Sequence, residues 1–221
     1  MRLNRALEAL LQRSIWLSGG AAATMARADE VIYALPAMNI PVNQYSLVID
    51  SPLGRLGMLV VDQQVQRLDY LDAAMPLRAA RGPFERKLLL QLEKYFHNPR
   101  AGFSVAFSLA GTPFQQRVWQ ALTRIPSGDT LTYGELAARL GTGARAVGNA
   151  CRRNPVSIIV PCHRVVAAGG IGGYSGSVNG ARVARKRWLL AHEGRPVAAL
   201  KNPALAPHSR THQIIKGDLP V

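Results

Sequence analysis

The sequence predicts a mixed α/β protein made of two consecutive units, and three observations support this. Short strand-like runs separated by turns fill residues 44–71, and an amphipathic helix pattern follows over residues 84–96. From residue 111 onward the patterns are mostly helical, and glycine or proline marks their ends. We therefore divide the chain into an N-terminal extension, an α/β unit, a second unit and an irregular proline-containing tail, with bounds 1–43, 44–110, 111–195 and 196–221.

The first unit is expected to contain strands followed by one helix. Its strand-like runs cover residues 45–50, 55–61 and 65–71, and the first two are separated by the turn Ser51-Pro52-Leu53-Gly54. Leucine and aromatic side chains recur at helical spacing in the helix that follows. Nothing in this unit indicates chemistry, so we interpret that stripe as core.

Helices are expected in the second unit over residues 112–125, 132–140, 144–153 and 183–192. Thr112, followed three residues later by Gln115, is a good N-cap, and Thr132 starts the next helix in the same way. A glycine turn joins the second and third helices, and the third is rich in small residues and arginine. This pattern indicates a helix-turn-helix.

The charge of the chain is high and uneven. Its 27 Lys and Arg against 13 Asp and Glu give a net charge of +14. Residues 111–221 hold 15 basic and 4 acidic residues, and no acid lies between Glu135 and Glu193. Such clustering favours a polyanionic partner, most simply nucleic acid, over a generic basic surface.

The two cysteines, Cys151 and Cys162, exclude a disulfide-rich scaffold and a four-cysteine zinc site. No clear secretory signal is present, so we expect the reducing cytoplasm, where thiols stay free. No apolar run approaches the roughly 20 residues that span a bilayer, so we expect no membrane association.

Cys162 is the candidate nucleophile. A β-branched run, residues 157–160, precedes it, and His163 follows it directly. Only the thiolate attacks electrophiles, so the thiol needs a base. In an extended strand neighbouring side chains point to opposite sides, so His163 reaches Cys162 only if the backbone turns or a water bridges them. Glu193 is the natural carboxylate to orient this histidine; the alternative is a buried, structural thiol.

The motif Ile158-Ile159-Val160-Pro161-Cys162-His163-Arg164-Val165-Val166 resembles the active-site signature of the O6-alkylguanine-DNA alkyltransferases, also called methylated-DNA–protein-cysteine methyltransferases. The resemblance covers residues 44–195 and is most specific from Gly111 onward. Further motifs follow the order of that family: Gly111-Thr112-Pro113-Phe114-Gln115, Thr132-Tyr133-Gly134-Glu135-Leu136, Ala144-Arg145-Ala146-Val147-Gly148, Asn154-Pro155, Gly173-Tyr174-Ser175-Gly176 and Trp188-Leu189-Leu190-Ala191-His192-Glu193-Gly194.

The resemblance implies direct reversal of DNA damage by an enzyme that acts once. Such proteins flip O6-alkylguanine out of double-stranded DNA and move the alkyl group onto their own cysteine as a stable thioether. Carried over by motif, Cys162 is the acceptor, His163 its water-linked base and Glu193 the acid that orients the histidine. Asn154 ties the recognition helix to the active-site strand.

The resemblance also assigns contacts to substrate and DNA. The substrate-binding residues are Tyr133, Val165, Tyr174 and Ser175. Tyr133 donates to guanine N3, the Ser175 N–H donates to O6, and the carbonyls of Cys162 and Val165 accept from the exocyclic amine. The DNA-binding residues are Arg145, Ala144, Gly148, Thr132 and Arg152. Arg145 resembles the arginine finger that fills the gap left in the duplex by the flipped base, and the alternative role for Arg145 is a phosphate contact. The alternative role for Tyr133 is that of a core tyrosine.

The resemblance further implies a small ribonuclease-H-like N-terminal domain and a helix-turn-helix C-terminal domain that carries the active site. We expect a monomer without metal or cofactor, and O4-alkylthymine stays open as a second substrate. The connection over residues 177–187 is longer and more basic than is usual in the family, and Cys151 is interpreted as an apolar filler. Two alternatives remain: a DNA-binding damage sensor without transfer activity, and an unrelated cysteine hydrolase.

Overall fold

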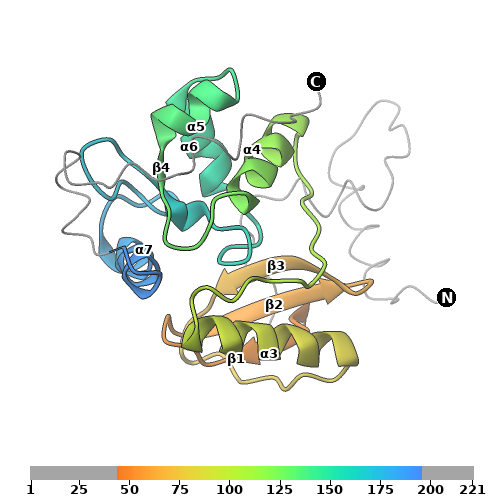
Figure 1. The fold of residues 1–221 in the computed structure, drawn as a ribbon. Coiled ribbons are helices and arrows are strands. Elements are labelled where there is room, and N and C mark those ends of the chain that lie inside the picture. The colour runs from red at the N-terminus through yellow and green to blue at the C-terminus, as the bar shows by residue number, and fades with distance from the viewer. Residues whose placement is uncertain (1–43, 196–221) are drawn as a thin grey trace, which may run out of the picture. The chain divides into compact units, whose positions relative to one another are not determined.

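The computed structural model describes residues 44–195, which lie within one compact unit of the chain (Figure 1). The expectations for residues 1–43 and 196–221 lie outside the described residues. Within the described part, no helix is long and apolar enough to cross a membrane. The architecture is mixed α/β, as the sequence predicts.

A three-stranded antiparallel sheet and one helix form the first half. Strands β1 (Leu47–Ile49), β2 (Leu56–Val61) and β3 (Gln64–Tyr70) lie side by side in that order. The predicted turn closes on itself, because Ser51 and Gly54 exchange backbone hydrogen bonds of 3.0 and 3.2 Å. Helix α3 (Pro83–His97) buries its leucine and tyrosine stripe in the same core as the inward side chains of the sheet. The predicted strands and helix are confirmed.

Local capping determines where the helices of the second half begin. Helices α4 (Pro113–Thr123) and α5 (Tyr133–Arg139) both start with a complete capping box, at Thr112 and Thr132. Helix α6 (Ala144–Arg152) follows after a glycine turn, and the indole N–H of Trp119 donates to Ala150 O at 2.9 Å. This bond ties α4 to α6, so the predicted helices form one packed group.

Two expectations are wrong. Residues 157–160 are buried but do not form a strand; Ile158 has φ +74°, and Val160 N donates back to Val156 O at 2.9 Å, so the segment is coiled. The basic segment 177–187 is mostly helix, because α7 runs over Gly180–His192. The prediction began that helix three residues too late, since Gly180 and Ala181 carry no apolar signal.

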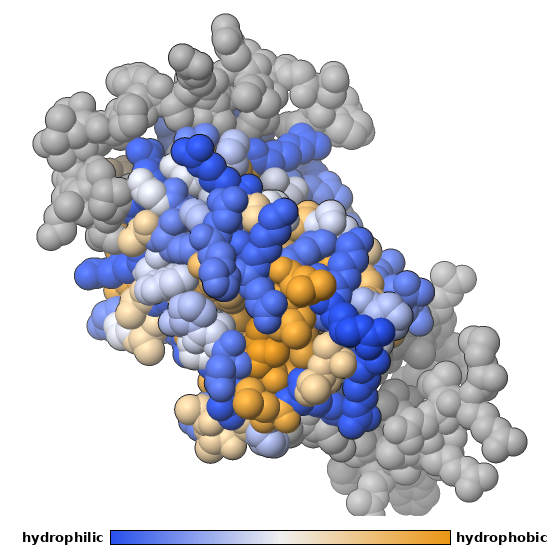
Figure 2. Space-filling view, turned by 60° about the horizontal axis from the view of Figure 1, so that its bottom comes forward, coloured by the Kyte–Doolittle hydropathy of each residue, from blue (hydrophilic) through white to orange (hydrophobic). Residues whose placement is uncertain are grey.

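The two halves share one hydrophobic core. Leu68 N in β3 donates to Pro155 O at 2.9 Å, and buried residues from both halves belong to the same cluster. The division near residue 110 therefore stays a prediction. Figure 2 shows hydrophobic side chains gathered in one area of the visible face, surrounded by hydrophilic ones. Within residues 44–195, the large apolar side chains that stay exposed are Val61, Leu77, Leu90 and Val178.

Candidate active site

A tight turn presents Cys162. The residue starts a short 3₁₀ helix, η2 (Cys162–Arg164), after the coiled segment that ends at Pro161. Its backbone N–H donates to Val160 O at 2.9 Å, and Arg164 N donates to Pro161 O at 3.0 Å. The backbone thus turns here, which is one of the two conditions for His163 to serve Cys162. Cys162 is 3% exposed.

His163 is oriented by Glu193. Its Nε2 lies 3.0 Å from Glu193 Oε1, and both side chains are buried. No hydrogen-bond partner for Nδ1 is found among the described protein atoms. A carboxylate partner assigns the proton to Nε2, since a carboxylate only accepts. The other ring nitrogen, Nδ1, is then left with its lone pair and can accept a proton.

Glu193 is the centre of a buried network of donors. Arg164 contacts it twice, from Nε to Oε2 at 2.9 Å and from Nη2 to Oε1 at 2.8 Å. The hydroxyl of Tyr95 donates to Oε1 at 2.8 Å, and Gly128 N approaches Oε2 at 3.4 Å. Burial alone raises the pKa of a carboxyl, but the bonds from His163 and Arg164 outweigh it and hold the pKa of Glu193 well below its usual range. Glu193 is therefore ionised.

Burial opposes charge on both Cys162 and His163. It raises the pKa of the Cys162 thiol, and Asn154 and Lys186 act in the opposite direction. It lowers the pKa of His163, whereas the hydrogen bond that His163 donates to Glu193 acts in the opposite direction. The resting site thus holds a neutral thiol beside a neutral histidine, and the proton must move when the thiol attacks.

Asn154 connects the end of α6 to the segment before Cys162. Its side-chain amide donates to Val160 O at 2.8 Å, and its Oδ1 accepts from Val156 N at 3.0 Å. The arrangement agrees with the predicted tie, except that the segment is coiled rather than a strand. The amide also stabilises the Cys162 thiolate by hydrogen bonding, since it lowers the pKa of that thiol.

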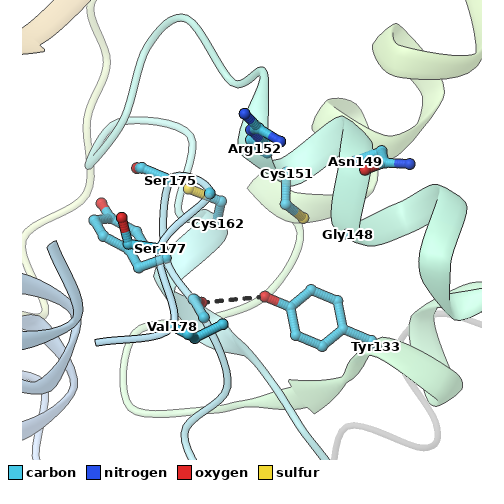
Figure 3. Close-up of a pocket in the computed structure, with 12 residues that line it drawn as sticks. Tyr133, Gly148, Asn149, Cys151, Arg152, Cys162, Ser175, Ser177 and Val178 are labelled. Atoms are coloured by element: carbon cyan, nitrogen blue, oxygen red, sulfur yellow. Dashed lines mark hydrogen bonds between the residues drawn. The ribbon is translucent and has the colours of Figure 1, made fainter. Parts of the chain in front are cut away.

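A pocket of about 220 Å³ opens beside Cys162 (Figure 3). The pocket is lined by some of the residues predicted for the site and by others that were not predicted. The lining residues are Tyr133, Gly148, Asn149, Cys151, Arg152, Cys162, Gly173, Tyr174, Ser175, Gly176, Ser177 and Val178. The hydroxyl of Tyr133 reaches Gly173 O at 3.4 Å across the pocket (Figure 3). Tyr133 is only partly buried, so its polar end is available inside the pocket.

Tyr174 lines the pocket, whereas Val165 is fully buried and is not among the lining residues; both are already bonded to protein groups. The hydroxyl of Tyr174 lies 3.0 Å from that of Tyr70, and Val165 O accepts from Lys186 Nζ at 2.7 Å. A carbonyl oxygen has two lone pairs, so Val165 can still accept a second bond. Both residues therefore stay candidates for substrate contact.

The predicted DNA-binding residues gather around α6. Ala144, Arg145 and Arg152 are exposed on this helix, and Gly148 is half-buried. Thr132 uses its hydroxyl to cap α5, where it accepts from Glu135 N at 3.1 Å. The hydroxyl only accepts in the cap, so its own O–H can still donate to a phosphate. The Thr132 backbone N–H, by contrast, already donates to Glu135 Oε2 at 2.6 Å.

Sequence reasoning missed Tyr70, Tyr95, Arg164 and Lys186. Lys186 is fully buried, and its Nζ donates to Val165 O and to Gly173 O at 2.7 and 2.9 Å. Burial lowers its pKa to about 8. A signal did exist, because Lys186 stands three residues after Val183 and three before Leu189, on the buried stripe of the helix. No comparable signal marks the tyrosines, whose spacing is that of ordinary core.

A buried cysteine, a histidine held by an ionised carboxylate and an adjoining pocket define a protein with a cysteine nucleophile. The family model for the 6-O-methylguanine DNA methyltransferase DNA-binding domain matches residues 113–195. The methylated-DNA–protein-cysteine methyltransferase of Mycobacterium leprae is 42% identical over 157 residues, which is 67% of this chain and 92% of the relative. The chain belongs to the methylated-DNA–protein-cysteine methyltransferase family.

Solved structures agree with this assignment. The crystal structure of Mycobacterium tuberculosis O6-methylguanine methyltransferase is 39% identical and has a TM-score of 0.56, covering 67% of this chain and 92% of that one. A structure of Mycobacterium tuberculosis OGT in complex with DNA, also 39% identical, has a TM-score of 0.55 and covers 70% of this chain and 96% of that one. The fold described here is thus shared with solved members of the family.

Proposed function

We propose that this protein repairs double-stranded DNA by moving the alkyl group of O6-alkylguanine onto Cys162. The observation that carries the proposal is Cys162 in the wall of a pocket, next to a histidine whose far nitrogen is held by Glu193. The bond formed is a thioether, which water does not cleave under ordinary conditions. Each molecule therefore reacts once, as an S-methyltransferase without turnover.

The transfer needs one proton relay and one displacement. A water between Cys162 and His163 carries the thiol proton to Nδ1, the nitrogen to which residues 44–195 offer no hydrogen-bond partner. The thiolate sulfur then bonds to the alkyl carbon, and the carbon–O6 bond breaks with its electron pair left on the guanine. The guanine gains one proton, which balances the proton lost by the thiol. Glu193 stabilises the imidazolium formed in between.

Donors around the pocket stabilise the leaving guanine. Burial raises the pKa of Tyr133, so its phenol stays protonated and can donate to guanine N3. The Ser175 N–H donates to O6, and the carbonyls of Cys162 and Val165 accept from the exocyclic amine. These contacts turn the purine into a better leaving group.

We further propose that α5 and α6 form a helix-turn-helix and that α6 enters the minor groove. The two helices are joined by a short turn in which Gly141 has φ +61°. Arg145 fills the gap left by the flipped base, and the small residues Ala144 and Gly148 allow close approach. Arg152 and Thr132 complete the interface by contacting phosphates.

Two finer assignments accompany this proposal. The antiparallel sheet covered by α3 supports a ribonuclease-H-like N-terminal domain. The free thiols Cys151 and Cys162 support the cytoplasm, because an acceptor thiol must stay reduced. The competing function, a DNA-binding sensor without transfer, does not require a cysteine that lines the pocket beside an oriented base.

The test is incubation with a duplex that carries one O6-methylguanine, followed by intact mass and peptide mapping. We expect one added methyl group on Cys162 and none in Cys162→Ser. In Cys151→Ser the methyl group is still expected on the peptide that contains Cys162, which shows that Cys162 and not Cys151 is the acceptor. Turnover beyond one methyl per molecule, or binding without any adduct, contradicts the proposal.

A further inference from the structure

The wall of the pocket opposite α6 is a two-residue turn in a strained conformation. Tyr174 N donates to Ser177 O at 2.8 Å and Ser177 N donates to Tyr174 O at 2.9 Å. The two residues between them, Ser175 and Gly176, have φ of +47° and +83°. This is the type I′ arrangement, in which a non-glycine residue at positive φ persists only when its surroundings hold it.

Two arginines hold this turn from different helices. The side chain of Arg152 in α6 lies against Gly176, where an added Cβ would come within 2.6 Å of its Nε. Arg182 in α7 donates from Nη1 to Ser175 O at 2.6 Å. Arg182 belongs to the basic segment 177–187.

The position of Arg182 is unfavourable for α7 itself. The residue is the third of the helix, and no acidic residue stands in that first turn. A cation at a helix N-terminus opposes the helix dipole and costs stability. The bond to Ser175 O is a contact that offsets this cost, and it joins the helix to the pocket wall.

We propose that Arg182 is a positioning residue for alkyl transfer, which holds the Ser175 turn so that its N–H meets guanine O6. The inference rests on the proposed function. Because Gly176 tolerates either sign of φ, the peptide between Ser175 and Gly176 can rotate when nothing holds its carbonyl. The bond from Arg182 holds this carbonyl in one direction. The Ser175 N–H belongs to the preceding peptide, whose carbonyl, Tyr174 O, accepts from Ser177 N at 2.9 Å, so Arg182 restrains it through the Cα that the two peptides share. A shift of about 1 Å at a reacting group is enough to slow chemistry strongly.

A phosphate contact is the competing role for Arg182, because its side chain is exposed on a basic helix. The two roles affect different quantities. A phosphate contact acts on duplex binding and its salt dependence. A positioning role acts on the rate of transfer after the duplex is bound.

The experiment is single-turnover methyl transfer from an O6-methylguanine duplex at increasing duplex concentration. It compares wild type, Arg182→Ala, Arg182→Lys and, as a matched control, Arg187→Ala, which removes an exposed positive charge from the same helix. We expect Arg182→Ala to lower the maximal rate constant about tenfold with little change in the half-saturating concentration, as for loss of one charged hydrogen bond. Arg182→Lys keeps a donor and recovers part of the rate, and Arg187→Ala keeps the maximal rate.

Two results overturn the inference. One is an unchanged maximal rate in Arg182→Ala together with a higher half-saturating concentration, which assigns Arg182 to phosphate. The other is an equal drop in maximal rate for Arg182→Ala and Arg187→Ala, which indicates a general charge effect. If wild type forms no Cys162 adduct, the proposed function fails instead, so the two failures are distinguishable.

Discussion

At the scale of single residues, Cys162 lies in surroundings that oppose its ionisation. Burial raises the pKa of its thiol, so most molecules at neutral pH hold it protonated. The opposing groups are the amide of Asn154 and the ammonium of Lys186. A protected, neutral thiol suits a protein that reacts once, because the acceptor is not lost to other electrophiles before the substrate arrives.

Lys186→Met tests the electrostatic part of this balance. Removing the positive charge is expected to raise the pKa of the Cys162 thiol and to slow methyl transfer at pH 7 by about tenfold, which corresponds to one pKa unit. The measurement is thiolate absorbance against pH, with Cys162→Ser subtracted to remove the signal of Cys151. Lys186→Arg keeps the charge and should recover part of the rate; an unchanged titration of Cys162 in Lys186→Met would show that the lysine acts only through its packing and its bonds to Val165 O and Gly173 O.

At the scale of elements, three short segments bring the site together. The turn η2 presents Cys162 and His163, the end of α7 supplies Glu193, and α6 carries the predicted DNA face next to the pocket. Each segment is positioned by backbone hydrogen bonds or caps, so the side chains need little freedom. Helix α6 therefore carries both the predicted DNA contacts and part of the pocket wall.

Arg145→Ala distinguishes the two roles left open for that residue. As a finger, Arg145 stabilises the flipped state, so transfer is expected to slow about tenfold while binding to undamaged duplex stays nearly unchanged. As a phosphate contact, its loss weakens binding and reduces the slope of log K against log salt by about one. Fluorescence anisotropy over a salt series, with single-turnover transfer in parallel, separates these outcomes. Arg124→Ala, at the exposed end of α4, is the matched control.

At the scale of the whole molecule, the first half is part of the site. Tyr95 of α3 donates to Glu193 across 98 positions of sequence, and Tyr70 of β3 contacts Tyr174 across 104. These bonds join the halves at buried points near Cys162. The interpretation of the first unit as core alone is therefore incomplete, because its tyrosines also support catalytic groups.

Acid should unfold the protein through these buried groups. Burial lowers the pKa of His163 below its ordinary 6.5, so the unfolded chain binds that proton first and stability falls as pH drops below about 6.5. The pKa of Glu193 is also lowered from 4.5, so its contribution is present above 4.5 and is lost as pH falls further. Urea unfolding at a series of pH values between 8 and 3 measures both losses of stability. The series is spaced most closely around the ordinary pKa values of histidine, 6.5, and glutamate, 4.5.

The variant Glu193→Gln checks the assignment of the lower step. It should start from a lower free energy of unfolding, because Arg164 loses its partner, and should lose less stability than wild type below pH 4.5. If the free energy of unfolding falls equally with pH in wild type and variant below pH 4.5, other carboxylates cause the loss of stability in acid.

Sequence reasoning predicted most of the helices and strands, and the roles that it assigned to the site residues stay predictions. The capped helices were predictable because Thr112 and Thr132 bond to residues only three positions away. The coiled segment before Cys162 was not, because a β-branched run is typical of both a strand and a buried coil. The start of α7 was missed for a similar reason, since its first turn lacks apolar side chains.

The sequence by itself determined the family, the acceptor motif and the starts of α4 and α5, since all of these depend on residues close together in the chain. Only the tertiary structure decided that Lys186 is buried with two carbonyls, that Tyr95 donates to Glu193, and that Arg182 reaches Ser175. The physical reason is packing. A buried polar group must find partners wherever the core places them, and those partners can stand anywhere in the sequence.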